Sequence, residues 1–475
     1  MGKYFIIGAG LSGLRIGQLL ATEGKSIEIF ESAGEIGGLM RTEKRNGFLF
    51  DIGPHIFFED YTDEYKRLIA NDLHNSKGLY GIAFNGRDII SPIRPSNLIK
   101  NLGIKKSLPL MRGVLQRKLG NLRAEAKSID NAEKWVISNF GNEVYRYFFK
   151  DYIPKVMGLA ANRVTEEWGT ERHKFYKEHN LWQKSLKFFL DFLVNKQNHG
   201  GYLNIYYPEH GARQVTDAMG EEILKHGGKI HLNTSVAELD VRDQRIDAVF
   251  INRNGVPERI SMADGDVVIS TMPITDLINS LISTNTNIDD CRNFSKALRY
   301  RNLWLFNFII QRHRLKDKVQ IYFPEAKYIF KRVYEPKNLV PSSVNTGKTA
   351  LCAEVCFDIG DEIDSMDESA ATSQVVAGLM DFYDLSEAEI LDVWSKKVPF
   401  AYSVYEIGYK QKLHHLAEFI FDIDNLISFG RQGSFRYNHM TNRVMDACNR
   451  VYNFLASGQT KREFLINSDP KADFF

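Results

Sequence analysis

The sequence has little of several features that would mark a specialised class of protein. Its 61 Lys and Arg residues are nearly balanced by 59 Asp and Glu residues, which leaves a formal net charge of +2. Such a balance gives no electrostatic reason to expect nucleic acid as a partner. No apolar run approaches the roughly 18 residues that a membrane-spanning helix needs. We therefore expect neither a nucleic-acid partner nor a transmembrane segment.

Cysteine is scarce as well, with four residues in a chain of 475. These cysteines are not spaced like metal ligands, and Cys352 and Cys356 lie in an apolar, strand-like run where we expect them to pack. This usage predicts no metal site and favours a reduced, cytoplasmic compartment. The N-terminus shows no basic region followed by an apolar stretch and a cleavage site, so we expect no targeting segment there.

The first 31 residues carry a strong local pattern. A short apolar run is followed by Gly8-Ala9-Gly10-Leu11-Ser12-Gly13, a helix-like stretch and a second strand-like segment that leads to Glu31. Gly8 permits a tight turn, Gly10 lets the backbone approach a pyrophosphate, and Gly13 lets helix and strand pack closely. The helix N-terminus offers N–H groups to phosphates, and Glu31 can bind ribose hydroxyls. The pattern predicts a dinucleotide site; the alternative is an ordinary glycine-rich turn.

Two further motifs suit a loop and a turn beside a cofactor. Gly37-Gly38-Leu39-Met40-Arg41-Thr42 places paired glycines before an arginine, and Arg41 could reach a phosphate or a flavin. A strand-like segment then ends in Gly53-Pro54-His55, which would deliver one imidazole through a backbone too slim to clash with a flat ring. The alternative for His55 is a turn histidine whose hydrogen bonds are satisfied locally.

The length and the changes of composition along the chain predict an α/β protein of two or three domains. Residues 61–200 are mostly helix-forming and indicate a helical insertion that could contact substrate. We expect a discontinuous, Rossmann-like dinucleotide-binding domain with a parallel sheet, assembled from residues 1–60, 201–290 and 420–460. Residues 291–419 are strand-rich and predict a mostly antiparallel sheet as the substrate domain.

Several shorter patterns predict individual elements. Asn254-Gly255 lies between two strand-like runs and is a hairpin signal. Residues 386–394 are expected to be helical. Residues 101–123 carry a run of Lys and Arg that we interpret as a solvated face. Residues 181–195 are amphipathic, and we expect them to pack against the core rather than to lie on a membrane surface.

Taken together, these motifs resemble those of the UDP-galactopyranose mutases, and of the amine oxidase and protoporphyrinogen oxidase-like flavoproteins that share their fold. The resemblance covers residues 1 to about 455. The segments that carry it are Gly8–Gly13 with Glu31, Gly37–Thr42, Asp51–Phe58, Lys150–Gly158, Glu166–Arg172, Asp266–Pro273 and Gly430–Tyr437.

The resemblance implies FAD as the cofactor, so the discontinuous domain would be an FAD-binding domain. Val236 would meet the adenine side through its backbone, and the Gly430–Gly433 segment would lie near the flavin. The expected cofactor-binding residues are Gly8, Gly10, Leu11, Ser12, Gly13, Glu31, Ser32, Gly38, Leu39, Arg41, Gly53, Pro54, His55, Val236, Thr271, Gly430, Arg431, Ser434 and Phe435.

The resemblance to the mutases also implies three catalytic residues. His55 matches the histidine beside the flavin ring, and Arg332 resembles an arginine that clamps the substrate diphosphate. Arg172 is similar to a second such arginine on a mobile loop, although an ordinary surface arginine is the alternative there. For Arg332 the alternative is a surface ion pair with Glu335.

Four residues are expected to bind substrate: Arg332, Arg436, Tyr437 and Met157. The chain departs from the mutases at two places. Met157 stands where the mutases have a tryptophan that stacks on uracil, and the segment after Tyr437 lacks the acid of related sequences. These departures leave the identity of the sugar and the nucleotide open.

The reaction implied by the resemblance is a rearrangement of a nucleotide-activated sugar, of the kind used in polysaccharide biosynthesis. N5 of the reduced flavin would attack the anomeric carbon and displace the nucleoside diphosphate, and the sugar would open and reclose without net redox. The alternative is an FAD-dependent oxidoreductase of the amine oxidase or protoporphyrinogen oxidase type, with an apolar slot walled by Trp304, Tyr402, Tyr405 and Tyr409. A protein that holds FAD without turnover is a third reading, and a homodimer is compatible with all three.

Overall fold

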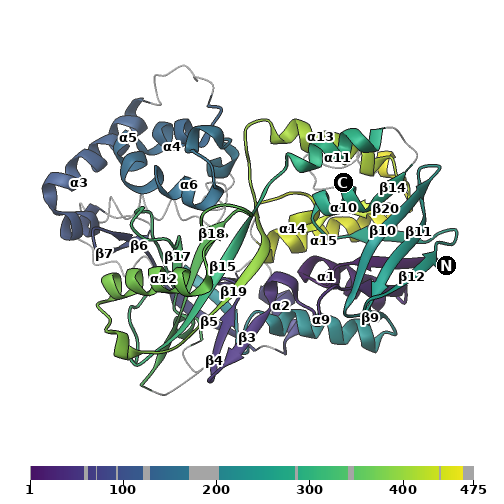
Figure 1. The fold of residues 1–475 in the computed structure, drawn as a ribbon, viewed down its shortest axis with the longest axis horizontal. Coiled ribbons are helices and arrows are strands. Elements are labelled where there is room, and N and C mark those ends of the chain that lie inside the picture. The colour runs from purple at the N-terminus through teal and green to yellow at the C-terminus, as the bar shows by residue number, and fades with distance from the viewer. Residues whose placement is uncertain are drawn as a thin grey trace.

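The computed structural model describes residues 2–57, 62–70, 72–91, 95–120, 129–170, 203–283, 287–340, 347–437 and 440–463. Figure 1 shows a parallel sheet with its helices toward one end of the long axis, and an antiparallel sheet with a helical unit toward the other. This arrangement confirms the predicted α/β class with a parallel sheet. Among the described helices, none is long and apolar enough to cross a membrane.

The parallel sheet has five strands in the order β20-β13-β1-β2-β9. Both of its faces are covered, so side chains on each side of a strand are buried. In β1, Ile6 packs toward the helices α1, α9 and α15, whereas Phe5 packs toward the opposite face. The bounds are β1 (Lys3–Ile7), β2 (Ser26–Phe30), β9 (Lys229–His231), β13 (Val267–Ser270), β20 (Leu426–Ser428), α1 (Leu11–Thr22), α9 (Arg213–Lys225) and α15 (Met440–Ser457).

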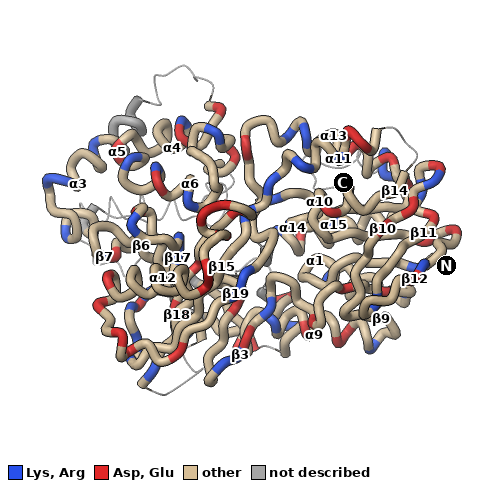
Figure 2. Tube along the Cα trace, in the orientation of Figure 1, with Lys and Arg blue, Asp and Glu red and all other residues tan. Residues whose placement is uncertain are grey.

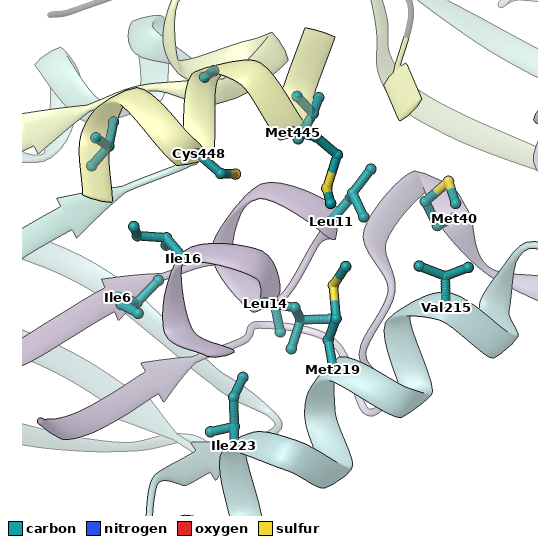
Figure 3. Close-up of a cluster of buried hydrophobic side chains, with 14 of the residues drawn as sticks. Ile6, Leu11, Leu14, Ile16, Met40, Val215, Met219, Ile223, Met445 and Cys448 are labelled. Carbon is teal, nitrogen blue, oxygen red and sulfur yellow. The ribbon is translucent and has the colours of Figure 1, made fainter. Parts of the chain in front are cut away.

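Figure 3 shows the core on the helix side of this sheet. Leu11 and Leu14 of α1 lie between Met219 of α9 and Met445 of α15, so α1 is enclosed by one helix from the middle of the chain and one from near its C-terminal end. The helix that follows the glycine turn is therefore held on several sides, which fixes the position of its N-terminus.

A four-stranded sheet covers the other face, in the order β12-β11-β10-β14. β11 and β12 form the predicted hairpin: Asn254 and Gly255 occupy its turn with φ of 51° and 87°. Such positive φ values are the reason that this dipeptide marks tight hairpins. The bounds are β10 (Thr234–Arg242), β11 (Arg245–Arg253), β12 (Val256–Ser261), β14 (Leu281–Ser283), α10 (Ile274–Ser280), α11 (Asn287–Lys296) and α13 (Tyr409–Phe421).

The second large sheet has seven strands in the order β19-β15-β18-β17-β16-β6-β7. Its neighbours are antiparallel except for β16 and β6, which run parallel. Helix α12 covers one face, and the β3–β4 ribbon packs against the other. The bounds are β3 (Thr42–Arg45), β4 (Phe48–Asp51), β6 (Tyr80–Phe84), β7 (Arg87–Ser91), β15 (Tyr300–Ile310), β16 (Gln320–Tyr322), β17 (Arg332–Tyr334), β18 (Thr349–Phe357), α12 (Glu368–Tyr383) and β19 (Ile390–Ser403).

The prediction of a helix over residues 386–394 is wrong. One short helical turn spans Glu387–Glu389, and β19 begins at Ile390 and pairs with β15 over most of its length. The exposure of residues 390–394 alternates, as expected of a strand with one face toward solvent. Pairing with the apolar strand β15 therefore decides the conformation of this segment.

The helical unit is built from α3 (Pro95–Gly120), α4 (Ala132–Phe140), α5 (Asn142–Val144) and α6 (Tyr152–Met157). Its core includes the buried Trp168 and Met157. Lys155 joins this unit to the antiparallel sheet, because its ammonium group donates to the carbonyls of Phe323 and Glu325 at 2.8 Å. The amphipathic segment 181–195 lies outside the described residues.

Candidate cofactor and substrate site

The glycine turn between β1 and α1 requires glycine at two of its positions. Gly8 has a φ of 97°, and a Cβ there would lie 2.6 Å from Oγ1 of Thr271. A Cβ on Gly13 would lie 1.9 Å from the carbonyl oxygen of Gly8, which accounts for the close packing of helix on strand. Thr271, also expected near the cofactor, hydrogen bonds through its hydroxyl to the carbonyl of Ile7 at 2.8 Å.

Helix α1 begins at Leu11, which Ser12 follows, and Gly10 is its N-cap. No side chain caps its first turn. The first turn also carries no acidic residue, so nothing there repels an anion. Gly38 lies over this end of the helix, and the two glycine Cα atoms face each other closely enough that a Cβ on Gly38 would be 3.0 Å from Gly10. The uncapped N–H groups suit a phosphate at this point.

Glu31 lies at the end of β2 and is 8% exposed. Its carboxylate accepts hydrogen bonds from the backbone N–H groups of Ala9 at 2.8 Å and Ala33 at 2.9 Å. Ser32 contacts the same carboxylate at 3.5 Å. The N–H of Thr234 donates to the carbonyl of Glu31, which brings the start of β10, and with it the predicted Val236, to this end of the sheet.

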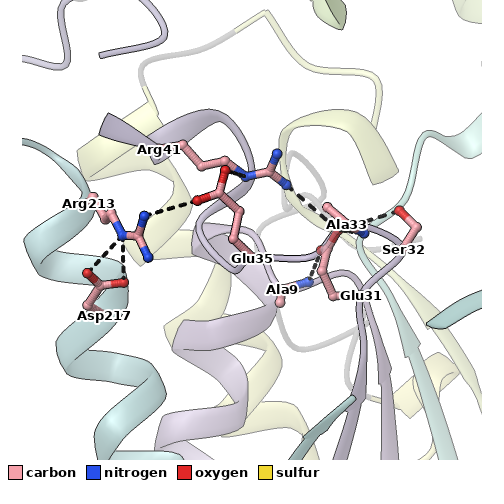
Figure 4. Close-up of polar contacts among 8 residues, drawn as sticks. All are labelled: Ala9, Glu31, Ser32, Ala33, Glu35, Arg41, Arg213 and Asp217. Carbon is pink, nitrogen blue, oxygen red and sulfur yellow. Dashed lines mark hydrogen bonds and ion pairs between the residues drawn. The ribbon is translucent and has the colours of Figure 1, made fainter. Parts of the chain in front are cut away.

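Arg41 connects Glu31 to a second group of charged residues, as Figure 4 shows. Its guanidinium lies 3.8 Å from Glu31 and also 3.8 Å from Glu35. Glu35 in turn accepts from Arg213 of α9 at 3.0 Å. The predicted arginine of the glycine-rich loop therefore lies beside the carboxylate that suits a ribose, with ion pairs that fix its direction.

The β4 strand ends in the turn that carries Gly53, Pro54 and His55. His55 is 8% exposed, and its Nε2 lies 2.7 Å from the carbonyl oxygen of Leu39. Because a carbonyl can only accept, Nε2 carries the hydrogen. Burial lowers the pKa of His55 to about 4, and the charges of Arg431 and Arg332 act in the same direction, against the hydrogen bond to Leu39. His55 is therefore neutral near pH 7, with Nδ1 as an acceptor.

Asp51 anchors this turn and was not among the predicted site residues. Its carboxylate accepts from Thr42 Oγ1 at 2.5 Å, from the backbone N–H of Ala212 at 3.3 Å and from the Tyr207 hydroxyl. The hydroxyl of Tyr334 donates to the backbone carbonyl of Asp51 at 2.8 Å. The sequence signal that could have identified Asp51 is a charged residue at the end of an otherwise apolar strand.

A buried cluster of charges contacts the Gly53 turn from the antiparallel sheet. Glu354 of β18 is completely buried, and it lies 3.0 Å from the ammonium group of Lys331. Arg332 of β17 donates to it from Nε at 2.9 Å and from Nη2 at 2.5 Å. A Cβ on Gly53 would be 3.2 Å from Glu354 and 3.3 Å from Arg332, so glycine is needed for this close approach. Arg332 thus pairs with Glu354 rather than with Glu335.

Arg431 and two tyrosines extend this cluster. Lys331 donates to the hydroxyl of Tyr402 at 2.6 Å, and the Arg431 guanidinium lies 5.3 Å from the centre of the same ring. The rings of Tyr402 and Tyr437 are 5.1 Å apart. Lys331 and Arg332 both pair with the carboxylate of Glu354, and the positive charge of Arg431 lies near that of Arg332. Among the described residues, the cluster therefore carries an excess of positive charge.

The remaining predicted residues lie in different surroundings. Gly430 has a φ of 87°, and a Cβ there would be 2.6 Å from Oγ of Ser12, so the end of β20 closes on the start of α1. Ser434 Oγ donates to the carbonyl of Gly430 at 2.5 Å. Phe435 is fully buried and its ring packs against Tyr300, so its side chain belongs to the core.

Three predicted substrate or catalytic residues are not brought into the cation cluster by any described contact of their side chains. Met157 is fully buried in the core of the helical unit. Arg436 follows the cofactor-side segment, and its N–H donates to the carbonyl of Arg431 at 2.8 Å. Arg172 lies outside the described residues.

Of the aromatic wall expected for an oxidase slot, Trp304 lies apart from the three tyrosines, which are linked to one another through the ring of Tyr437. Trp304 lies in the core beneath α12, and its indole N–H donates to Ser395 at 2.7 Å. Tyr405 and Tyr409 stack on each other at 4.7 Å in the core beside the parallel sheet. Of the four residues, Tyr402 contacts the cation cluster directly.

Comparison with known proteins places the chain in a family. The family model described as flavin-containing amine oxidoreductase matches residues 11–426. The chain belongs to this family.

The mitochondrial protoporphyrinogen oxidase of Nicotiana tabacum is 24% identical over 311 residues, which cover 59% of this chain and 60% of that protein. A 4,4'-diapophytoene desaturase of Methylomonas sp is 25% identical over 266 residues, 50% of this chain and 48% of that one. The chain thus matches about half to three-fifths of the length of these relatives.

The comparison of folds finds a solved structure that matches almost the whole chain. A structure of reduced UDP-galactopyranose mutase superposes with a TM-score of 0.80 at 19% identity, and the match covers 98% of each chain. At this identity the likeness shows the fold. Membership of the family makes the protein an FAD-dependent enzyme, as the resemblance of its motifs implied. The uncapped start of α1, the glycine backbone at Gly10 and the buried carboxylate of Glu31 fit the phosphates and a ribose of that cofactor.

Proposed function

We propose that the protein rearranges a nucleotide-activated sugar in the manner of the UDP-galactopyranose mutases. The observation that carries this proposal is the excess positive charge beside the turn that holds His55: Lys331 and Arg332 share the one carboxylate of Glu354, and Arg431 lies near Arg332 and His55. A diphosphate supplies the negative charge that such a cluster lacks, and guanidinium groups bind phosphate oxygens in forked pairs. The likeness in fold to the mutase supports the same assignment.

The buried carboxylate would give this site its rigidity. Glu354 holds Arg332 through two N–H groups, so the guanidinium has one orientation before substrate arrives. Lys331 is fixed between Glu354 and the Tyr402 hydroxyl. A cation that is already oriented loses little entropy when an anion binds. Bound FAD in its reduced form would supply the nucleophile, and His55 would offer a neutral hydrogen-bond acceptor beside it.

The clamp can be tested with the FAD-loaded protein and UDP. We expect Arg332→Ala to weaken the binding of UDP about 100-fold in isothermal titration calorimetry, because a charge-assisted contact to phosphate is lost. Arg332→Lys keeps the charge without the fork and should give an intermediate affinity. Arg312→Ala is a matched control, since Arg312 pairs with Glu389 away from this cluster. Unchanged affinity for UDP in Arg332→Ala, with an unaltered flavin spectrum, would contradict the role of Arg332 as a diphosphate clamp.

The alternative is an oxidoreductase of the protoporphyrinogen oxidase or amine oxidase type. Two observations favour it: the sequence match to protoporphyrinogen oxidase, and the Tyr402–Tyr437 ring pair beside the cation cluster. An oxidase would consume oxygen when an amine or a porphyrinogen is added to the oxidised enzyme. Oxygen consumption in an electrode assay, with no isomer formed from a sugar nucleotide, would establish this alternative instead.

A further inference from the structure

The outer side of α3 exposes large aliphatic side chains. Ile104 is 66% exposed and Leu108 is 61% exposed, and their spacing of four residues places them on the same side of the helix. Leu110, which follows the kink at Gly103 as they do, is buried, and so is Leu98 before the kink, which shows that another side of α3 already packs against the protein. The exposed aliphatic pair is therefore additional to the packing that holds α3 in place.

The sequence around this apolar surface is basic and contains no acidic residue that would balance its positive charge. Between Ile89 and Arg123 the sequence contains no Asp or Glu, but it contains the basic residues Arg94, Lys100, Lys105, Lys106, Arg112, Arg117, Lys118 and Arg123. Figure 2 shows Lys and Arg along the described part of α3, at the far end of the molecule from the parallel sheet. Lys100, Lys105, Lys106 and Arg112 are exposed.

Three acidic residues of the neighbouring elements are engaged by cations of their own, and a fourth, Glu133 of α4, hydrogen bonds with Tyr145. Asp88 of β7 lies 2.9 Å from Lys318. Glu143 of α5 lies 2.9 Å from Arg146, and Asp130, just before α4, lies 2.9 Å from Lys134. These pairs leave the charge of α3 to act outward. A partner that covers this face must supply negative charge together with apolar depth.

We propose that α3 docks on the surface of a lipid bilayer that contains anionic lipids. Ile104 and Leu108 would enter the boundary between headgroups and acyl chains, and Lys105, Lys106 and Arg112 would contact the anionic headgroups. An isologous contact with a second copy would bring the same positive charges face to face. A nucleic acid would meet no aromatic side chain, because residues 85–134 contain no Phe, Tyr or Trp for bases to stack on.

The test uses the full chain with FAD bound and two kinds of vesicle. One is phosphatidylcholine alone, and the other also contains about 30% phosphatidylglycerol, which makes its surface anionic. We expect sedimentation with the anionic vesicles at low salt, little with phosphatidylcholine alone, and release as salt is raised. Lys105→Gln with Lys106→Gln should lower the partition coefficient about 30-fold, since each basic residue contributes roughly a factor of five. Ile104→Asn with Leu108→Asn should also release the protein.

Matched controls separate this face from general surface effects. Ile359 is 86% exposed on another part of the chain, so Ile359→Asn should bind vesicles like the parent. Lys229→Gln removes an exposed charge elsewhere and should do the same. Equal vesicle binding by the parent and both α3 double variants would overturn the proposal. So would absence of binding to anionic vesicles, a concentration-dependent dimer lost in the α3 variants, or tight RNA binding that the Ile104 and Leu108 changes leave intact.

Discussion

Asp51 is a buried carboxyl group held at the end of β4 by three hydrogen bonds. Burial raises its pKa to about 6, against the lowering effect of the hydrogen bonds from Thr42, Tyr207 and Ala212. The ordinary value is 3.8, so the folded protein keeps a proton that the unfolded chain loses between about pH 4 and pH 6. The stabilising contribution of this proton is fully present below pH 4 and is lost as the pH rises through 6.

We predict a specific pH dependence from this group. Relative to Asp51→Asn, whose side chain does not titrate, the free energy of unfolding of the parent should fall by about 2 kcal/mol between pH 4 and pH 6.5. Urea unfolding followed by fluorescence at a series of pH values measures the difference. Asp392→Asn serves as a control, because Asp392 is a partly exposed partner of Arg45. A difference that stays flat over this pH range would contradict the assigned burial.

Single residues also show which parts of the candidate site a local sequence pattern can indicate and which it cannot. Glu31 and His55 were predicted because they follow local patterns of strand, glycine and turn. Lys331 and Glu354 were not, because the match of β17 to β18 that joins them is a tertiary contact between strands. One signal was present: Glu354 is a charged residue within the apolar strand Thr349–Phe357, and a buried charge needs a partner.

At the scale of elements, the β1-turn-α1 unit makes the sharpest prediction about the cofactor. Gly10 has an ordinary φ of −79°, and a Cβ there would have no protein atom nearer than 3.9 Å. Alanine at this position is therefore compatible with the protein itself. It conflicts with a pyrophosphate that approaches the backbone closely.

We predict that Gly10→Ala folds with nearly unchanged thermal stability yet binds FAD at least tenfold more weakly. Visible absorbance of the purified protein and fluorescence titration of apoprotein with FAD measure the effect. Gly113→Ala is the matched control, because a Cβ at that helical position also meets nothing nearer than 3.8 Å and lies in α3, away from the turn. Retention of parental FAD affinity in Gly10→Ala would show that the phosphates do not approach this backbone.

Elements with strong local signals were predicted, and those decided by pairing were not. The first strand, the glycine turn and the Asn254-Gly255 hairpin follow from the local preferences of their residues. The segment after Glu389 contains residues that suit a helix as well as a strand. Its conformation follows from its pairing with β15, which lies about 85 residues earlier in the chain and is invisible to a local pattern.

At the scale of the whole molecule, the candidate site exists only where distant segments meet. The turn after β4, strands β17 and β18, the end of β19 and the Gly430 segment each contribute one or two of its side chains. The motifs indicated which segments should face a cofactor. They could not predict that Lys331 and Arg332 would share one buried carboxylate, because that result depends on the register of the antiparallel sheet.

The measurement that tests the central claim most directly is turnover of sugar nucleotides by the FAD-loaded protein, with and without dithionite. UDP- and TDP-linked hexoses are incubated anaerobically, and their ring isomers are separated by chromatography. The excess positive charge beside His55 predicts that the reduced protein forms a ring isomer from at least one of them, that the oxidised protein forms none, and that Arg332→Ala is inactive. Reduced protein that leaves every sugar nucleotide unchanged, while oxidised protein consumes oxygen with an amine or a porphyrinogen, would contradict the account.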